Sequence, residues 1–426
     1  MLYQLFEWLR SNGVKVPGGS LFLFITFRML LAVILSLIVT MVFGKRLIRL
    51  LLAKQVGESD RELGLAWEQQ KKGTPTMGGI VIILAILVPT LLLADLHKAY
   101  IRLMIFSTLW LGLIGFIDDY LKLRAKRIAQ QQGIAYKKGD KDGLAGWFKV
   151  LGQVVLGVVV AGVLLFNDNT KAYREFLGDK APTDSAVIKR IPFDGKERVF
   201  VVAKEPITTI PFVKTHEFNY ARLLPQALRG LSWLLYMVIV IFIVIAVSNG
   251  ANITDGLDGL ATGTSAVIGI CLGIFAYASG NILFADYLNI MYIPNLGELS
   301  IFIGALVGAC IGFLWYNAYP AQVFMGDTGS LTLGGIIAAL AIIVRKELLI
   351  PIFCGVFLVE NLSVVIQVTY FKYTKKKYGE GRRIFLMSPL HHHYQKQGYH
   401  ESKIVTRFWI VTILCVAFAI VTLKIR

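Results

Sequence analysis

The chain has 426 residues, of which 56% are hydrophobic and only 17% are charged, with a mean hydropathy of +0.64. Soluble domains contain about 45–50% apolar and about 25% charged residues, so this composition excludes an ordinary soluble protein and indicates a multi-pass membrane protein. The net charge of +17 does not predict nucleic-acid binding, because the basic residues cluster at the ends of apolar runs, where they set orientation and contact lipid headgroups.

The apolar residues are collected into runs of roughly 17–25 residues, each long enough as a helix to cross a hydrocarbon core of about 30 Å. They predict an all-α polytopic membrane protein with about ten transmembrane helices in a single domain, residues 1–426. The predicted spans are Leu21–Phe43, Gly78–Ala94, Tyr100–Ile117, Trp147–Phe166, Leu231–Val247, Leu260–Ser279, Leu299–Trp315, Leu331–Val344, Leu348–Phe371 and Ile404–Leu423.

Lysine and arginine predict the orientation of these spans. They are frequent in the loops after the first, third and ninth spans and sparse after the second, sixth and eighth. Because basic loops stay in the cytoplasm, both termini are expected on the periplasmic or extracellular side. The segment 167–230 is too long for its charge to count, and its "RVFVVAKEPITTIPFV" predicts short strands in an external insert. Arg28, near the outer end of the first span, is expected to reach the headgroups.

The stretch "SNGANITDGLDGLATG" places Asp255 and Asp258 beside two apolar runs without a lysine or arginine of its own. An aspartate at the centre of a lipid-facing helix costs about 2.5–3.5 kcal/mol, while each Leu, Ile, Phe or Val returns only about 0.3–0.6 kcal/mol. These two acids are therefore expected at a water interface or in a protein-lined cleft, with partners from other loops.

Other polar motifs fall at span ends of the same parity, so the predicted topology brings them to the same cytoplasmic face. They are "KKGTPTMGG" with Lys71 and Thr76, "GFIDDYLK" with Asp118, Asp119 and Lys122, "YNAYPAQVFMGDTGSL" with Asn317, Phe324 and Asp327, and "MSPLHHHY" with His391, His392 and His393. The sequence therefore predicts a cleft that opens toward the cytoplasm.

The residue types at this face suit a divalent cation and a phosphate. Neighbouring carboxylates hold a proton or bind a cation, and carboxylate oxygens with phosphates are the ligands that Mg²⁺ prefers. The glycine-rich "GDTGS" at the start of a helix offers N–H groups to an anion. Taken singly, each motif is also compatible with a solvated loop, a turn or a helix cap, and consecutive histidines lack the helical spacing of a zinc site.

These motifs, in this order, resemble those of the phospho-N-acetylmuramoyl-pentapeptide transferase family, within the superfamily of polyprenyl-phosphate N-acetylhexosamine-1-phosphate transferases. The resemblance implies Mg²⁺-dependent transfer of phospho-MurNAc-pentapeptide from UDP-MurNAc-pentapeptide to undecaprenyl phosphate, which forms lipid I and UMP. It implies a multi-pass protein of the bacterial inner membrane, in contact with membrane lipid, and leaves a homodimer open. The loops at about 122–146 and 372–403 are longer here than in the family's usual pattern.

Roles carried over by the resemblance are as follows. A catalytic role is implied for Asp118, Asp119, Asp327 and His391, and a metal-binding role for Asp327, Asp118 and Asp119. Substrate binding is implied for Lys71, Thr76, Lys122, Lys149, Asn252, Asp255, Asp258, Asn317, Phe324, Gln367, His392 and His393. Within this set, Phe324 takes the position associated with stacking on uracil.

Two rival functions remain open from the sequence. A related sugar-1-phosphate transferase that uses another UDP-N-acetylhexosamine would share the aspartates, although "SPLHHHY" and "PAQVFMGDTGS" favour the muramoyl-pentapeptide enzyme. A secondary transporter also keeps acids within its spans, but such sites normally lie near the membrane midplane between internal repeats. Here the acids lie at span ends, and the sequence shows no repeat.

Overall fold

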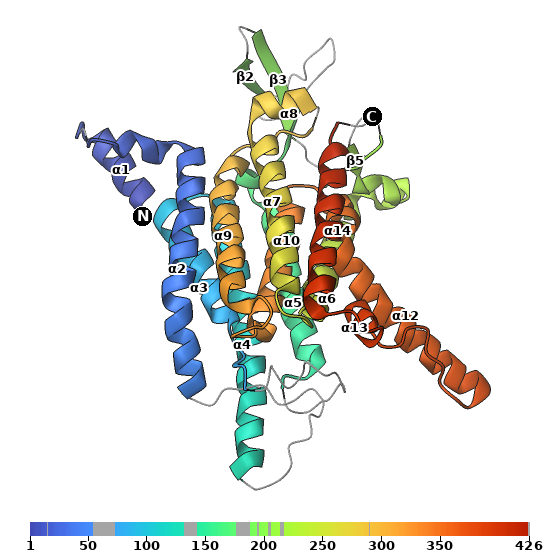
Figure 1. The fold of residues 1–426 in the computed structure, drawn as a ribbon. Helices are drawn as coiled ribbons and strands as arrows, with labels where there is room; N and C mark the ends of the chain where they lie inside the picture. Colours follow the sequence, from blue (N-terminus) through green and yellow to red (C-terminus); the bar gives the residue numbers. More distant parts are fainter. Residues whose placement is uncertain are drawn as a thin grey trace.

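A computed structural model describes residues 1–14, 16–53, 73–131, 143–175, 188–193, 196–202, 206–213, 217–288 and 290–424. Most of this part of the chain is helical, and the long helices run side by side in a bundle (Figure 1). The C-terminus and strands β2 and β3 lie at one end of the bundle, and the C-terminal part of α4 extends from the other. We call these the opposite end and the site end.

The α-helices follow one another along the chain, and the strands are confined to the segment between α5 and α6. The α-helices are α1 (Leu2–Ser11), α2 (Ile25–Ala53), α3 (Gly79–Leu93), α4 (Ala99–Gln131), α5 (Gly146–Phe166), α6 (Ser232–Thr254), α7 (Leu260–Gly280), α8 (Ile282–Leu288), α9 (Leu299–Asn317), α10 (Gly326–Ile343), α11 (Ile350–Phe353), α12 (Gly355–Tyr378), α13 (Leu390–Lys396) and α14 (Glu401–Val421). The short 3₁₀ helices are Gly19–Leu23, Asp168–Thr170, Tyr220–Leu223, Gln226–Leu231, Leu296–Glu298 and Glu347–Leu349.

Every predicted span overlaps a helix, but the expected count of about ten is not confirmed. In the described part of the chain, eight helices are long and apolar enough to cross a membrane. The predicted span Leu348–Phe371 is broken, because the helices Glu347–Phe353 and Gly355–Tyr378 meet at an angle of 80°, and counting them as one span gives nine. Helix α3 is also apolar, but with 15 residues it is shorter than these helices.

Helix α10 forms the centre of the bundle. All of its residues from Thr328 to Ile343 are buried, and it packs against α3, α4, α5, α6 and α7. Around it, helices approach closely where glycines face a neighbour. On α9, Gly304 and Gly308 face the backbone of α2, and a Cβ built on either would lie under 3.0 Å from an α2 carbonyl oxygen. This spacing of small residues is typical of tightly packed membrane helices.

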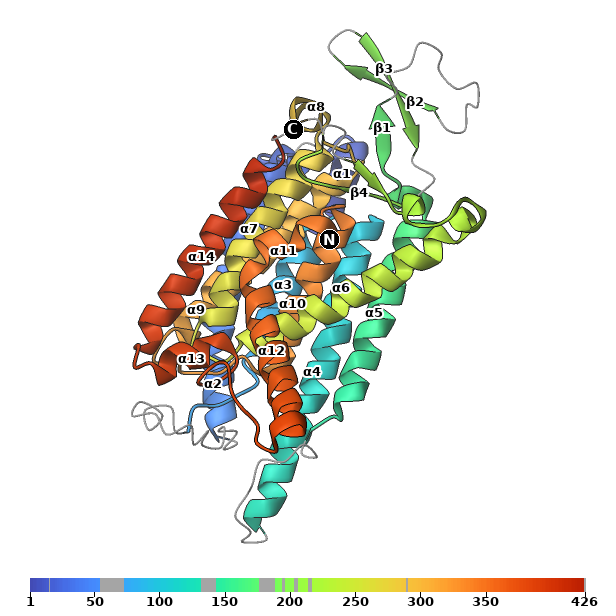
Figure 2. The same ribbon diagram turned by 90° about the vertical axis from the view of Figure 1, so that its right-hand side faces the viewer.

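The predicted strands of the insert are confirmed. Strands β1 (Tyr173–Glu175), β2 (Ile188–Phe193) and β3 (Lys196–Val202) form an antiparallel sheet in the order β1-β3-β2, with Ile188 opposite Val201 and Phe193 opposite Lys196. Strands β4 (Ile207–Thr209) and β5 (Glu217–Asn219) form a second antiparallel pair. Figure 2 shows β1, β2 and β3 beyond the ends of the helices, away from the site end.

The expectation for Arg28 is wrong. Its side chain is only 2% exposed and forms a two-pronged ion pair with Glu298, in which Nη2 and Oε2 are 2.9 Å apart. The guanidinium also donates to the carbonyl of Leu93 and lies over the ring of Tyr3. A carboxylate supplied by a distant part of the chain therefore holds Arg28 inside the protein, in place of lipid headgroups.

Candidate functional site

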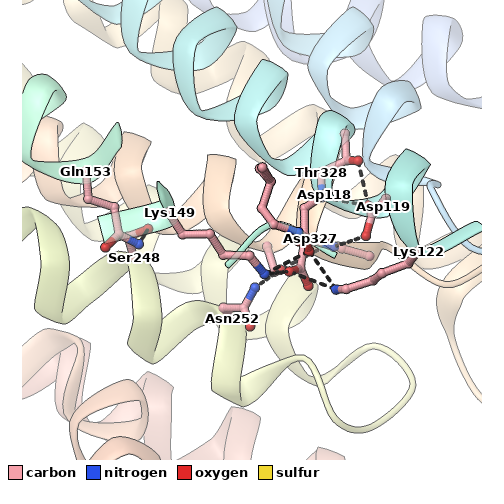
Figure 3. A network of polar contacts seen from close by, with 12 residues as sticks. Asp118, Asp119, Lys122, Lys149, Gln153, Ser248, Asn252, Asp327 and Thr328 are labelled. Atoms are coloured by element: carbon pink, nitrogen blue, oxygen red, sulfur yellow. Dashed lines mark hydrogen bonds and ion pairs between the residues drawn. The ribbon is translucent and has the colours of Figure 1, made fainter. Parts of the chain in front are cut away.

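Three aspartates meet where the C-terminal half of α4 crosses the first turn of α10 (Figure 3). Asp118 and Asp119 come from α4, and Asp327 comes from α10. One carboxylate oxygen from each lies within 4.8 Å of the others. This spacing is compatible with a shared metal ion, because oxygens that bind the same cation must lie near one another.

Two lysines occupy the space between these carboxylates, approaching from opposite sides (Figure 3). Nζ of Lys122 is 2.6 Å from Oδ2 of Asp118 and 3.1 Å from Oδ2 of Asp327. Nζ of Lys149 is 2.8 Å and 2.5 Å from the same two oxygens. Since three carboxylates face two ammonium groups, the cluster lacks one positive charge.

Asp119 is bound differently from Asp118 and Asp327. Its Oδ1 accepts a hydrogen bond from the N–H of Asp327, and its Oδ2 accepts from both the N–H and the hydroxyl of Thr328. Asp119 thus caps the N-terminus of α10 and orients Asp327. The N–H groups of Asp327 and Thr328 are therefore not free for an anion, because a carboxylate of the chain already takes them.

The turn after α6 carries the second pair of acids. Asp258 is buried, its Oδ2 accepts from the N–H of Ala321, and its own N–H donates to Oε1 of Glu401. Asp255 is half-buried at the end of α6. Asn317 connects this turn to the next loop, because its Oδ1 accepts from the N–H of Gly259 and its Nδ2 donates to the carbonyl of Val323.

Two further predicted residues lie beside the first turn of α10. Phe324 is half-buried in the segment that leads into α10, and this segment is held by bonds from its N–H to Pro75 and from Gly78 to its carbonyl. Thr76 lies close to Gly326, whose φ of 71° requires a residue without a side chain. On the other side, Nδ2 of Asn252 donates to the hydroxyl of Ser330.

The remaining predicted residues lie around α12 and α13. Oε1 of Gln367 accepts from the N–H groups of Ile384 and Phe385, and its amide nitrogen donates back to Phe385, so in this structure it holds the loop before the histidines. The histidines occupy three of the seven positions of the short helix α13. Lys71 lies outside the described residues.

Sequence reasoning missed several residues that hold this site. Glu360, a buried acid within α12, binds both the backbone and the ring of His391. Glu401 binds the turn of Asp258, and Thr328 binds Asp119. An acid inside an apolar run is itself a signal of function, and Glu360 could have been found by that signal alone.

Comparison with known proteins agrees with the motifs. The model of "Glycosyl transferase family 4" matches residues 196–345, and "Phospho-N-acetylmuramoyl-pentapeptide-transferase signature 1" matches residues 71–83. Proteins named phospho-N-acetylmuramoyl-pentapeptide-transferase from Flavobacterium johnsoniae and Flavobacterium psychrophilum are each 57% identical to this chain, and one from Parabacteroides distasonis is 52% identical. In all three comparisons the match covers 100% of both chains.

Proposed function

Because this chain belongs to the phospho-N-acetylmuramoyl-pentapeptide-transferase family, and is therefore a membrane-bound glycosyl-phosphate transferase of peptidoglycan synthesis, we propose its full reaction. It transfers phospho-MurNAc-pentapeptide from UDP-MurNAc-pentapeptide to undecaprenyl phosphate, forming lipid I and UMP with the aid of Mg²⁺. The observation that carries this proposal is the cluster of Asp118, Asp119 and Asp327 with Lys122 and Lys149.

The donor set of the cluster fits Mg²⁺. Its oxygens are hard carboxylate ligands, they lie close together, and the charge they leave uncompensated is negative. Asp118 and Asp327 would hold the ion, and Asp119 would contribute only the lone pairs that its hydrogen bonds to α10 leave. When bound, Mg²⁺ would neutralise charge on the diphosphate and on the departing UMP.

The side chains of the protein would bind and orient the substrates by their position and charge. Lys122 and Lys149 lie on both sides of the cluster and would bind phosphate oxygens of the donor and of the lipid acceptor. The lipid phosphate is largely ionised at neutral pH, so its attack on the β-phosphorus of the donor needs no strong base. Phe324, half-buried beside α10, would stack on the uracil, and Asn252, Asp255 and the histidines would bind the nucleotide and diphosphate.

The reaction requires the site end to face the cytoplasm of a bacterial inner membrane, because the nucleotide substrate is soluble and the acceptor is a lipid. The basic loops at this end support that orientation. Two exposed positions test it, Ser402 at the site end and Asp286 at the opposite end. In spheroplasts, an impermeant thiol reagent should label Asp286→Cys at once and Ser402→Cys only after lysis. The reverse pattern would overturn the orientation.

The substrate is tested by presenting purified protein in detergent with undecaprenyl phosphate, Mg²⁺ and one UDP-sugar at a time. Release of UMP from UDP-MurNAc-pentapeptide, and not from UDP-GlcNAc, is the expected result. Release from UDP-GlcNAc alone would establish the related hexosamine-1-phosphate transferase instead, which the broader glycosyl transferase match leaves as the second candidate.

A further inference from the structure

A buried contact joins α12 to α13 beside the site. Oε1 of Glu360 accepts a hydrogen bond from the main-chain N–H of His391 at 3.2 Å, and Oε2 lies 3.0 Å from the ring nitrogen Nδ1. Both side chains are 0% exposed. An ionised carboxylate can only accept hydrogen bonds, so this two-point contact places a proton on Nδ1 and fixes the ring and the backbone of His391 together.

The second ring nitrogen of His391 has a different environment. Nε2 is buried and makes no hydrogen bond to any residue in the described part of the chain. It faces Gly256, between Asp255 and Asp258, and a Cβ built on Gly256 would lie 2.1 Å from Nε2. A buried polar atom without a partner costs free energy, and in native proteins such atoms are exceptional and point to function.

The neighbouring histidines do not share this arrangement. Nδ1 of His393 accepts from the N–H of Leu386, and its Nε2 contacts the amide of Gln397. Nδ1 of His392 contacts the amide oxygen of Gln395. Within the histidine run, the carboxylate contact on one nitrogen and the unpartnered second nitrogen therefore distinguish His391. A carboxylate that orients an imidazole in this way leaves the far nitrogen ready for a substrate.

We propose that Glu360 is a positioning residue for the transferase reaction: it holds His391 with its proton on Nδ1, so that Nε2 faces the turn of Asp255 and Asp258 as the ring atom that meets the substrate. This inference rests on the proposed function for the identity of that substrate. Neutral Nε2 accepts a hydrogen bond from a substrate hydroxyl, and protonated Nε2 donates to a phosphate oxygen. Glu360 supports both states, because its carboxylate accepts from Nδ1–H in each.

The first test is the isosteric variant Glu360→Gln. Its amide can donate to Nδ1, which moves the ring proton to Nε2, so that a neutral ring can no longer accept a hydrogen bond there. The neutral amide also no longer stabilises a protonated ring. We expect kcat to fall by about 10²–10³ and KM to change by less than about threefold. In a His391→Asn background, the same change should cause no further loss, because Glu360 acts through His391. Losses that multiply in the double variant, or an unchanged kcat in the single one, would overturn the proposal.

A second variant disturbs the same ring from its other side. The φ of Gly256 lies outside the left-handed region, so the backbone accepts alanine, but the new Cβ must displace Nε2. Gly256→Ala should lower kcat by at least about tenfold, and this effect too should vanish in the His391→Asn background. The matched control is Gly162→Ala, where a Cβ meets no atom within 4 Å and full activity is expected. Losses that multiply in the double variant would overturn the assignment of Nε2 as the ring atom that meets the substrate.

A spectroscopic readout separates this inference from the proposed function. In ¹⁵N-histidine-labelled protein, the signals that His391→Asn removes belong to His391. They should show a protonated Nδ1 in the unmodified chain and a protonated Nε2 in Glu360→Gln, whichever UDP-sugar is the substrate. A failure of UDP-MurNAc-pentapeptide to release UMP would refute the function alone, and an unmodified ring protonated only on Nε2 would refute the positioning role of Glu360.

Discussion

Both ends of the helix bundle bury charged side chains, and the difference between them shows what distinguishes a site from a structural anchor. At the opposite end, Arg28 and Glu298 carry opposite charges that cancel, and their side chains are 2% and 8% exposed. At the site end, the side chains of Lys122 and Lys149 are 39% and 21% exposed, and negative charge is in excess. Charged side chains are buried at both ends. Of these two groups, only the cluster at the site end has uncompensated charge and a solvent-accessible edge.

A second cluster at the opposite end, Arg345, Lys346 and Glu347, is also buried and bound by protein groups. Nη1 of Arg345 donates to the hydroxyl of Tyr236, and the hydroxyl of Tyr220 donates to Oε1 of Glu347. Nζ of Lys346 donates to the hydroxyl of Thr209 in β4. These side chains connect the insert between α5 and α6 to the helices, so their partners are protein groups and their role is structural.

The largest expected effect separates the two ends by activity. Asp327→Asn removes the carboxylate that both lysines share, so Mg²⁺-dependent release of UMP should fall by at least about 10³-fold. The apparent Tm in detergent should remain within a few degrees of the parent value, because the amide still fills the same space. Near-normal turnover at ordinary Mg²⁺ would remove Asp327 from the proposed metal site.

The reverse pattern is expected at the opposite end. Glu298→Gln leaves the buried guanidinium of Arg28 without its counter-charge, which typically costs about 3–5 kcal/mol of stability. Thermal unfolding followed by tryptophan fluorescence should show a clear fall in apparent Tm. Specific activity of the folded protein at low temperature should stay within about twofold, since none of the site residues that the structure describes contacts this pair. A large loss of turnover without a change in Tm would contradict this separation.

These outcomes depend on contacts of very different predictability. The helices could be predicted because a long apolar run indicates a membrane-spanning helix by its own composition. From these spans it could also be predicted that the motifs of alternate loops meet at the same end. The partners of individual charges could not. Arg28 meets Glu298 across 270 positions, Asp258 meets Glu401 across 143, and His391 meets Glu360 across 31. No local pattern specifies such pairs.

The fold departs from expectation where local geometry overrides composition. The predicted span Leu348–Phe371 is largely apolar, yet its helices bend by 80° at Cys354, between Pro351 at the start of α11 and Gly355 at the start of α12. Hydropathy does not depend on the direction of a helix, so it cannot predict this bend. The cap by Asp119 could not be predicted either, because "GDTGS" predicts the start of a helix but not the group that binds its N–H groups.

A smaller effect on activity tests the accessible edge of the site. Lys122→Met removes one of the two ammonium groups while Lys149 remains, so kcat/KM should fall by about 10–100-fold. The matched control is Arg124→Met on the same helix, whose side chain is exposed and whose loss should change kcat/KM by less than about twofold. Similar losses in both variants would mean that general positive charge on α4, and not the cluster, supports activity.

The smallest effect concerns the pH dependence of stability, through Lys346 in the buried cluster at the opposite end. Burial lowers the pKa of Lys346 from 10.5 to about 7, although Glu347 opposes this. Between these two values the unfolded chain holds a proton that the folded protein has released, so the free energy of unfolding should rise with pH by up to about 1.4 kcal/mol per unit. Lys346→Met should abolish this rise, measured as apparent Tm from pH 7 to pH 9. An equal slope in both proteins would show that Lys346 stays charged.

The central position of α10 has a consequence for the way this protein meets its surroundings. Every residue of α10 from Thr328 onward is enclosed by other helices, so the segment that begins with Asp327 has almost no contact with acyl chains. Changes in bilayer thickness or fluidity act first on the outer helices, including α4 with Asp118 and Asp119, and reach Asp327 only through the helices packed around α10. Asp327 is thereby separated from the bilayer, even though one of the proposed substrates is itself a lipid.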